Sequence, residues 1–313
     1  MMTESIREGF SIAGRNLHLV LLRVGVTIIN VSGFFVFMAV PVAVAAAYMG
    51  IDLTHARDLL PSLIDNPFEF VSRYLGLVLL VGTAFVFYLT FASLLLLYAL
   101  SGILGVLKNA ALDVHYRFSL RSFFSEANGN FLRLLWLASL LFGCLTVALT
   151  VAVAAGGILA AAAQTFSGGE RTIEVFLRSF ALVSIIVFTI IIFIAGTVFS
   201  VYCMVASVVE KKGAVDSVKS TFVFLKKKPE AFLFYIILIA GIVAASLVFF
   251  ILGLPFRVIP VLAPVMNIAL SLMNIVFQAY LMVVMWGCLI VYYIRGADHP
   301  APPSFSPPEI PLR

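Results

Sequence analysis

Six long stretches of the chain contain no Asp, Glu, Lys, Arg or His: residues 24–51, 74–107, 134–169, 179–209, 231–256 and 258–294. A helix that crosses a bilayer core needs about 20 apolar residues, so each stretch is long enough to cross. The pattern therefore predicts six membrane-spanning helices, at residues 24–47, 75–100, 134–162, 181–207, 231–254 and 265–294.

Composition supports a membrane protein. Hydrophobic residues make up 63% of the 313 residues, charged residues make up 11%, and the mean hydropathy is +1.14. Soluble domains are about 45–50% apolar and about 25% charged. A water-soluble fold cannot bury this much apolar surface, which excludes a soluble enzyme, a nucleic-acid-binding protein and a secreted disulfide scaffold. The expected fold is an all-α polytopic membrane protein, with residues 1–294 as a single six-span domain.

The distribution of charge predicts the orientation. An even number of spans places both termini on one side, and that side carries fifteen Lys and Arg residues against five on the other. Since cytoplasmic loops carry the excess of Lys and Arg, we expect both termini in the cytoplasm. A basic cytoplasmic face also suits anionic lipid headgroups, which makes membrane lipids the expected partners. Topology alone would produce the same charge distribution, so lipid binding is here a hypothesis.

Three twelve-residue segments align without gaps: SIREGFSIAGRN from Ser5, SLRSFFSEANGN from Ser119 and SVKSTFVFLKKK from Ser217. Each has Ser first, an aliphatic residue second, Arg or Lys third and Phe sixth, and each leads into an odd-numbered span. Apolar residues spaced i, i+4 and i+7 form one face of a helix, and the leading Ser is expected to cap its N-terminus. Chance similarity among basic amphipathic segments is the alternative to a true repeat.

The repeat predicts the architecture. Each unit is an amphipathic helix followed by a helical hairpin, and the units cover residues 3–107, 117–209 and 215–294. All three units start on the same side of the membrane, so they are parallel repeats related by an axis along the membrane normal. We therefore expect a pseudo-threefold bundle of three hairpins. Residues 295–313 form a Pro-rich cytoplasmic tail that is either disordered or docked to a soluble partner.

Two sets of side chains are candidate lipid contacts. Basic residues in and after the three segments are candidates to face lipid headgroups: Arg7, Arg121, Lys219, Lys226, Lys227 and Lys228. The Phe at the sixth place of each segment is a candidate anchor for a helix that lies in the headgroup layer: Phe10, Phe124 and Phe222.

One polar face is predicted inside a span. A spacing of four, three and four residues puts four polar side chains of the sixth span on one helical face: Asn267, Ser271, Asn274 and Gln278. Amides exposed to hydrocarbon are costly, so this face is expected to point at other helices or at water. It is either hydrogen-bonding glue between helices or a polar wall for a small solute or lipid headgroup.

No catalytic, cofactor or metal site is expected. The four His residues lie far apart outside the spans and show no metal-ligand spacing: His18, His55, His115 and His299. The predicted spans hold no ionisable Asp, Glu, His, Lys or Arg, which argues against proton coupling through the core. Nucleic acid is not an expected partner.

The segment VVEKKGAVDSVKSTFVFLKKKPEAFLFY joins a basic amphipathic helix and a Lys-Pro turn to a span. In this arrangement of amphipathic helix, turn and span, the chain resembles bacterial six-span proteins of the glycerophosphoryl diester phosphodiesterase membrane-domain type. The resemblance implies a multi-pass protein of the bacterial inner membrane. In that family the hydrolase chemistry belongs to a separate soluble domain, so the resemblance implies no catalytic residue here.

Two functions remain open. The first is a non-enzymatic membrane organiser or accessory subunit, which binds lipids or a protein partner through its basic face and amphipathic helices. The second is a transporter or channel for a small solute or lipid between the three hairpins. The apolar spans without ionisable residues favour the first.

Overall fold

The computed structural model describes residues 1–48, 68, 72, 75–166, 171–258 and 263–297, and these residues contain helices and no strand. The helices and their bounds are α1 (Met2–Arg15), α2 (His18–Phe34), the π-helix η1 (Phe35–Ala39), α3 (Val40–Tyr48), α6 (Leu75–Leu112), α7 (Leu120–Phe166), α8 (Arg171–Glu210), α9 (Ala214–Lys227), α10 (Glu230–Val258) and α11 (Ala263–Gly296). Leu and Phe residues among charges at 55–73 also predict a short outer amphipathic helix. Most of this segment and nearly all of the Pro-rich tail lie outside the described residues.

Six helical segments are long and apolar enough to cross a membrane, which confirms the six predicted spans. They are His18–Ala45, Leu75–Leu112, Leu120–Ile158, Val175–Glu210, Glu230–Phe256 and Met266–Gly296. Most run past the charge-free stretches, because Lys, Arg and Glu at the ends of a span do not stop a helix. The described part of the chain is helical without strands, and the protein has the composition of a multi-pass membrane protein.

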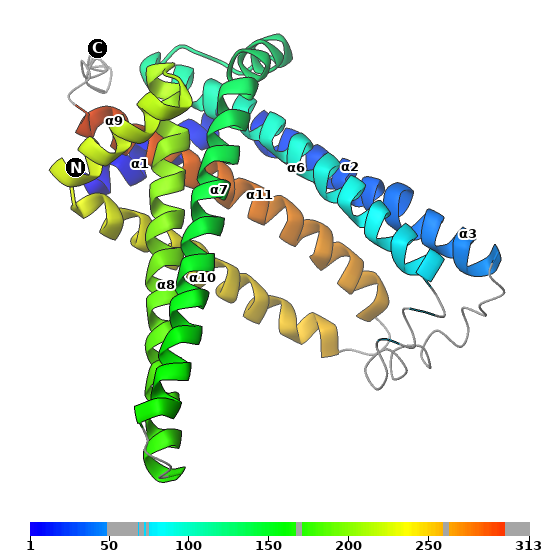
Figure 1. Ribbon diagram of the computed structural model, residues 1–313. Helices are drawn as coiled ribbons and strands as arrows, with labels where there is room; N and C mark the ends of the chain where they lie inside the picture. The colour runs from blue at the N-terminus through cyan, green and yellow to red at the C-terminus, as the bar shows by residue number, and fades with distance from the viewer. Residues whose placement is uncertain (49–67, 69–71, 73–74, 167–170, 259–262, 298–313) are drawn as a thin grey trace, which may run out of the picture.

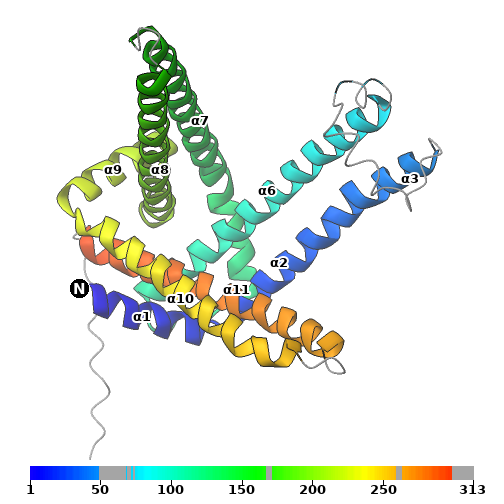
Figure 2. The same cartoon turned by 90° about the horizontal axis from the view of Figure 1, so that it is seen from below.

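The spans form three hairpins that meet at one end and diverge at the other (Figures 1 and 2). The helices α2 and α3 pair with α6, α7 pairs with α8, and α10 pairs with α11. The short helices α1 and α9 lie at the end where the hairpins meet. This end, which also includes the start of α7 and the last turns of α6, α8 and α11, is here called the hub.

The packed core of the protein lies in the hub. Its largest fully buried side chains include Tyr202, Phe234, Tyr292 and Tyr293. In the most apolar window of α11, 67% of the residues are buried, whereas the corresponding value for the other five spans is 6–11%. The divergent arms therefore present Leu, Ile, Val and Phe side chains outward, which is the surface that lipid chains cover in a membrane.

Local sequence explains where the helices break. Pro41 lacks an amide hydrogen and crowds the carbonyl four residues before it, and the π-helical turn Phe35–Ala39 lies at this point. Pro229 separates α9 from α10. No proline lies between Leu120 and Phe166, so the second amphipathic segment and the third span form one continuous helix of 47 residues.

The expected capping role of Ser is correct for one segment and wrong for two. Ser119 precedes α7, and its hydroxyl accepts a hydrogen bond of 3.1 Å from the amide of Ser122. In contrast, Ser5 and Ser217 lie inside α1 and α9, which begin three residues earlier. Their hydroxyls donate to the carbonyls of Met1 and Gly213, four residues before them.

Candidate functional site

The three aligned segments, residues 5–16, 119–130 and 217–228, are helical except for one terminal residue each, and they are here called the elbows. Two aligned sets of positions are buried in every elbow: Gly9, Phe123 and Thr221, and Ala13, Ala127 and Leu225. Two other aligned sets are exposed in every elbow: Arg7, Arg121 and Lys219, and Phe10, Phe124 and Phe222. The elbows therefore turn equivalent faces inward, and the anchor Phe side chains lie on the outer face.

Each elbow packs on the final turns of an even-numbered span. Gly9 of α1 crosses α11 so closely that an added Cβ atom would lie 2.6 Å from the amide nitrogen of Cys288. The ring of Phe123 occupies the space beside Gly102 of α6. Thr221 of α9 lies beside Cys203 of α8. The elbows and the even spans thus form a closed ring, with α1 completing it against the last span.

A polar contact reinforces each crossing seven residues further along the even span. Asn109 of α6 donates to Glu126 at 3.1 Å. Glu210 of α8 pairs with Lys212 at 2.7 Å, and Lys212 donates to the hydroxyl of Ser220 in the third elbow at 3.0 Å. Arg295 of α11 pairs with Glu8 of α1 at 2.6 Å. The three crossings therefore share a polar contact at the same place on the even span, and each contact includes a carboxylate.

Further hydrogen bonds tie the hairpins to one another in the hub. Lys108, which the sequence placed in a cytoplasmic connection, is only 8% exposed and donates to the carbonyl of Val208 at 3.1 Å. Tyr293 donates to Glu210 at 2.6 Å, which links α11 to α8. These bonds hold the inner ends of the hairpins together while the arms diverge.

An apolar groove of about 670 Å³ lies between α7, α8, α9 and the start of α10. Its walls include Leu141, Cys144, Ala148, Phe199, Leu225 and Phe232. Two of the predicted lipid contacts, Phe222 and Lys226, also line it. This α7–α9 groove therefore combines a long apolar surface with one cationic side chain.

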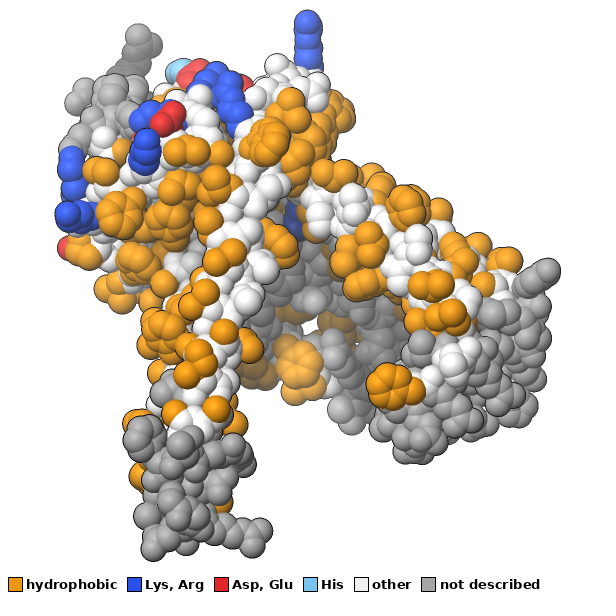
Figure 3. Space-filling view, viewed as in Figure 1, with side chains coloured by type: hydrophobic (Ala, Val, Ile, Leu, Met, Phe, Trp, Pro, Cys, Tyr) orange, Lys and Arg blue, Asp and Glu red, His pale blue; other side chains and the backbone are white. Residues whose placement is uncertain are grey.

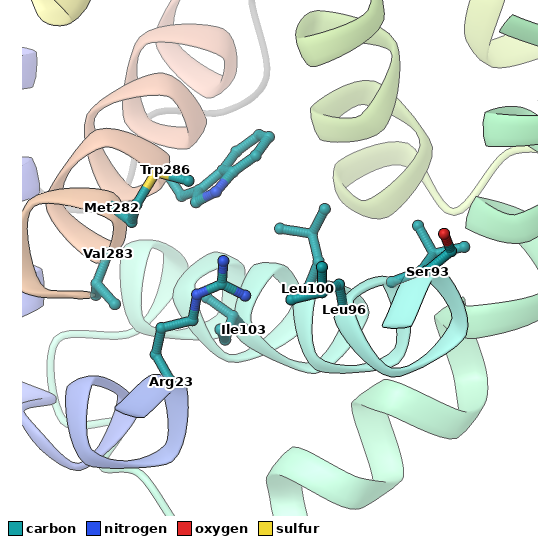
Figure 4. Close-up of a pocket in the computed structure, with 9 residues that line it drawn as sticks. Arg23, Ser93, Leu96, Leu100, Ile103, Met282, Val283 and Trp286 are labelled. Atoms are coloured by element: carbon teal, nitrogen blue, oxygen red, sulfur yellow. The ribbon is translucent and has the colours of Figure 1, made fainter. Parts of the chain in front are cut away.

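A second pocket, of about 230 Å³, lies between α2, α6 and α11 (Figure 4). Arg23 of α2 points into it, among Leu100 and Ile103 of α6 and Met282 and Trp286 of α11. In the sequence, Arg23 is the last charged residue before the first predicted span, and it counts there only toward the orientation of the chain. The sequence signal for its location is that it lies directly before a charge-free stretch. In the structure α2 begins five residues earlier, at His18, so Arg23 lies within the helix.

The predicted polar face of the sixth span divides in the structure. Gln278 donates to the hydroxyl of Ser246 on α10 at 2.8 Å, which is a contact between helices. Asn267, Ser271 and Asn274 are exposed, and the Ser271 hydroxyl bonds the carbonyl of Asn267 in its own helix. One of the four side chains therefore forms an interhelical hydrogen bond, and the other three are exposed on the surface of α11.

Charged side chains gather on the hub, and the visible arms are mainly apolar (Figure 3). The other candidate basic residues follow this pattern, since Lys226 and Lys227 are exposed and Lys228 is half-buried at the end of α9. Within the described part of the chain, no group of three His, Cys, Asp or Glu side chains is placed to hold a metal ion.

Comparison of the chain with protein-family models, with curated proteins and with solved structures gives no match. The resemblance to the phosphodiesterase membrane domain therefore stays a prediction, and the function is argued from the geometry.

Proposed function

We propose that this protein is a non-enzymatic membrane organiser that binds anionic lipids at the cytoplasmic face of the bacterial inner membrane. The observation that carries the proposal is the α7–α9 groove, whose lining combines apolar walls with a candidate lipid contact, Lys226. Acyl chains suit such walls, and a basic side chain near the membrane surface adds about 1 kcal/mol of attraction for anionic lipid. A groove of this volume falls in the range of about 300–1,000 Å³ typical of ligand sites.

The proposal includes three parallel repeats with both termini in the cytoplasm. Its support is the closed ring of elbows, in which the four aligned sets described above are buried or exposed in the same way. The gathering of Lys and Arg on the hub supports a cytoplasmic hub, because these residues are enriched on that side. The resemblance to lipid-related bacterial membrane domains agrees with this placement. A protein partner on the basic face is part of the same proposal.

Transport is the second candidate function, and one observation favours it. Asn267, Ser271 and Asn274 are exposed on α11 although they lie in a span. Polar side chains at membrane depth often mark a solute path or contact another polar group. Replacing Asn267 and Asn274 by Leu should abolish solute flux into proteoliposomes if they line a path, and should leave lipid binding unchanged in either case.

Native mass spectrometry of the purified protein tests lipid binding. The wild-type protein should retain phosphatidylglycerol in preference to phosphatidylcholine, and Lys226→Gln should reduce that retention. Arg117→Gln is the matched control, because Arg117 is exposed on the connection before α7 and does not line the groove. Equal retention of both lipids by the wild-type protein would refute the proposal.

A further inference from the structure

The pocket at Arg23 has the features of a binding site for an anion with an apolar body. Arg23 is half-buried, and its side chain points between α6 and α11 (Figure 4). The other residues that line the pocket are apolar apart from the Ser93 hydroxyl and the indole N–H of Trp286. A guanidinium presents five hydrogen-bond donors and no acceptor, so this pocket is rich in donors.

No carboxylate of the described residues pairs with the Arg23 side chain. Four acidic side chains of the hub have other partners: Glu4 and Glu8 bind Arg295, Glu210 binds Lys212, and Glu126 accepts from Asn109 and Asn130. A guanidinium among apolar side chains within a span is costly unless an anion or water satisfies it. An anion from outside the chain would supply the missing partner.

We infer that this pocket binds the phosphate group of an anionic phospholipid. The planar guanidinium matches two phosphate oxygens at once, which gives charge-assisted, bidentate hydrogen bonds. A volume of about 230 Å³ suits a phosphate and the first atoms of its glycerol esters, and the Leu, Ile and Met walls suit the start of the acyl chains. The inference rests on the proposed lipid binding and assigns it a second, specific site away from the α7–α9 groove.

The position of Arg23 agrees with this assignment. It lies five residues into α2, so about 7.5 Å further along the helix than His18 at a rise of 1.5 Å per residue. If the hub lies at the membrane surface, Arg23 is at the depth where lipid phosphates meet acyl chains. The bound lipid would then contact α2, α6 and α11 together and join the first hairpin to the third.

The test counts phospholipids bound to the wild-type protein, Arg23→Gln, Arg23→Lys and the control Arg117→Gln by native mass spectrometry during titration with phosphatidylglycerol. We expect Arg23→Gln to lose one bound lipid or to bind it on the order of tenfold more weakly, because charge-assisted hydrogen bonds are lost. Arg23→Lys should be intermediate, since it keeps the charge without the bidentate geometry. Equal occupancy in Arg23→Gln and the wild-type protein would overturn the inference.

Two further measurements separate the explanations. Lys226→Gln should keep the Arg23-dependent lipid. If the wild-type protein shows no preference for phosphatidylglycerol over phosphatidylcholine, the proposed function itself is refuted. Oleate that displaces this lipid at equal concentration would overturn the phosphate assignment in favour of a carboxylate. Arg23→Leu should raise the melting temperature in lipid-free detergent and reduce the gain that phosphatidylglycerol gives the wild-type protein, while the gain from the α7–α9 groove remains. A lower melting temperature with an undiminished gain would contradict the inference.

Discussion

The crossing of α1 and α11 gives the sharpest prediction, because a single methyl group at Gly9 has no room. A Cβ atom there would lie 2.6 Å from the amide nitrogen and 2.8 Å from the Cα atom of Cys288. Both are backbone atoms, so rotation of a side chain cannot relieve the contact. The helices must separate, and overpacking of this kind costs about 1–3 kcal/mol.

Gly14→Ala is the matched control on the same helix, since nothing lies within 4 Å of a Cβ atom at that position. Alanine is favoured over glycine inside a helix by about 0.5–1 kcal/mol, so this change should stabilise the protein slightly. Gly9→Ala gains the same helical preference and loses more at the crossing. We expect the two variants to differ by about 1–3 kcal/mol in the free energy of unfolding, with Gly9→Ala the less stable.

The assay is thermal unfolding in mild detergent, followed by tryptophan fluorescence, in which the buried Trp286 reports the change and Trp136 is already exposed. Maleimide labelling provides a second readout, because Cys288 is fully buried at the crossing. The exposed Cys144 is first replaced by Ala. Gly9→Ala should unfold at lower temperature and label Cys288 faster. Equal stability of the two variants, with Cys288 protected in both, would refute the close crossing.

Further predictions concern other contacts of the hub and spans. Gln278→Leu and Ser246→Ala should show a coupling energy of about 0.6–1.7 kcal/mol in a double-mutant cycle of unfolding in detergent, and additive effects would exclude their hydrogen bond. Arg295→Gln should release α1, which protease digestion near the N-terminus detects; the charge-swapped pair Arg295→Glu with Glu8→Arg should restore resistance, and a pair as sensitive as the single variant would contradict the ion pair. A Cys introduced at Lys228 should react with membrane-impermeant reagents only after cells are opened, and reaction in intact cells would reverse the orientation.

The sequence was sufficient to predict the spans, because the absence of charge over twenty or more residues has few other physical explanations. Helix ends were less predictable. Nothing in the sequence marks a break before the third span, so α7 is continuous from Leu120, whereas Pro229 marks the break before the fifth. Capping by Ser119 was predictable from residue type, and the interior positions of Ser5 and Ser217 depended on where each helix begins.

The candidate site was predictable only in part. Exposure of Phe10 beside the buried Ala13 was not predicted, whereas the exposed basic side chains of the elbows follow from amphipathic spacing within one helix. The partner of each elbow does not, because Gly9 meets Cys288 and Gly102 meets Phe123 across long separations in the chain. Arg23 was counted as a topology signal, since its lack of a carboxylate partner becomes visible only when the surrounding helices are in place. Contacts of this kind, between segments far apart in the chain, produce no periodic pattern of residues in the sequence.

The central claim is that three equivalent elbows hold the spans around one hub at the cytoplasmic membrane boundary. The most direct measurement is the depth of nitroxide labels placed singly at positions 10, 124 and 222 of the protein in phosphatidylglycerol-containing vesicles. Depth follows from the ratio of collision rates with oxygen and with a water-soluble nickel complex. The account predicts one common depth near the headgroups for all three labels. Labels at unrelated depths, or a label in bulk water, would contradict it.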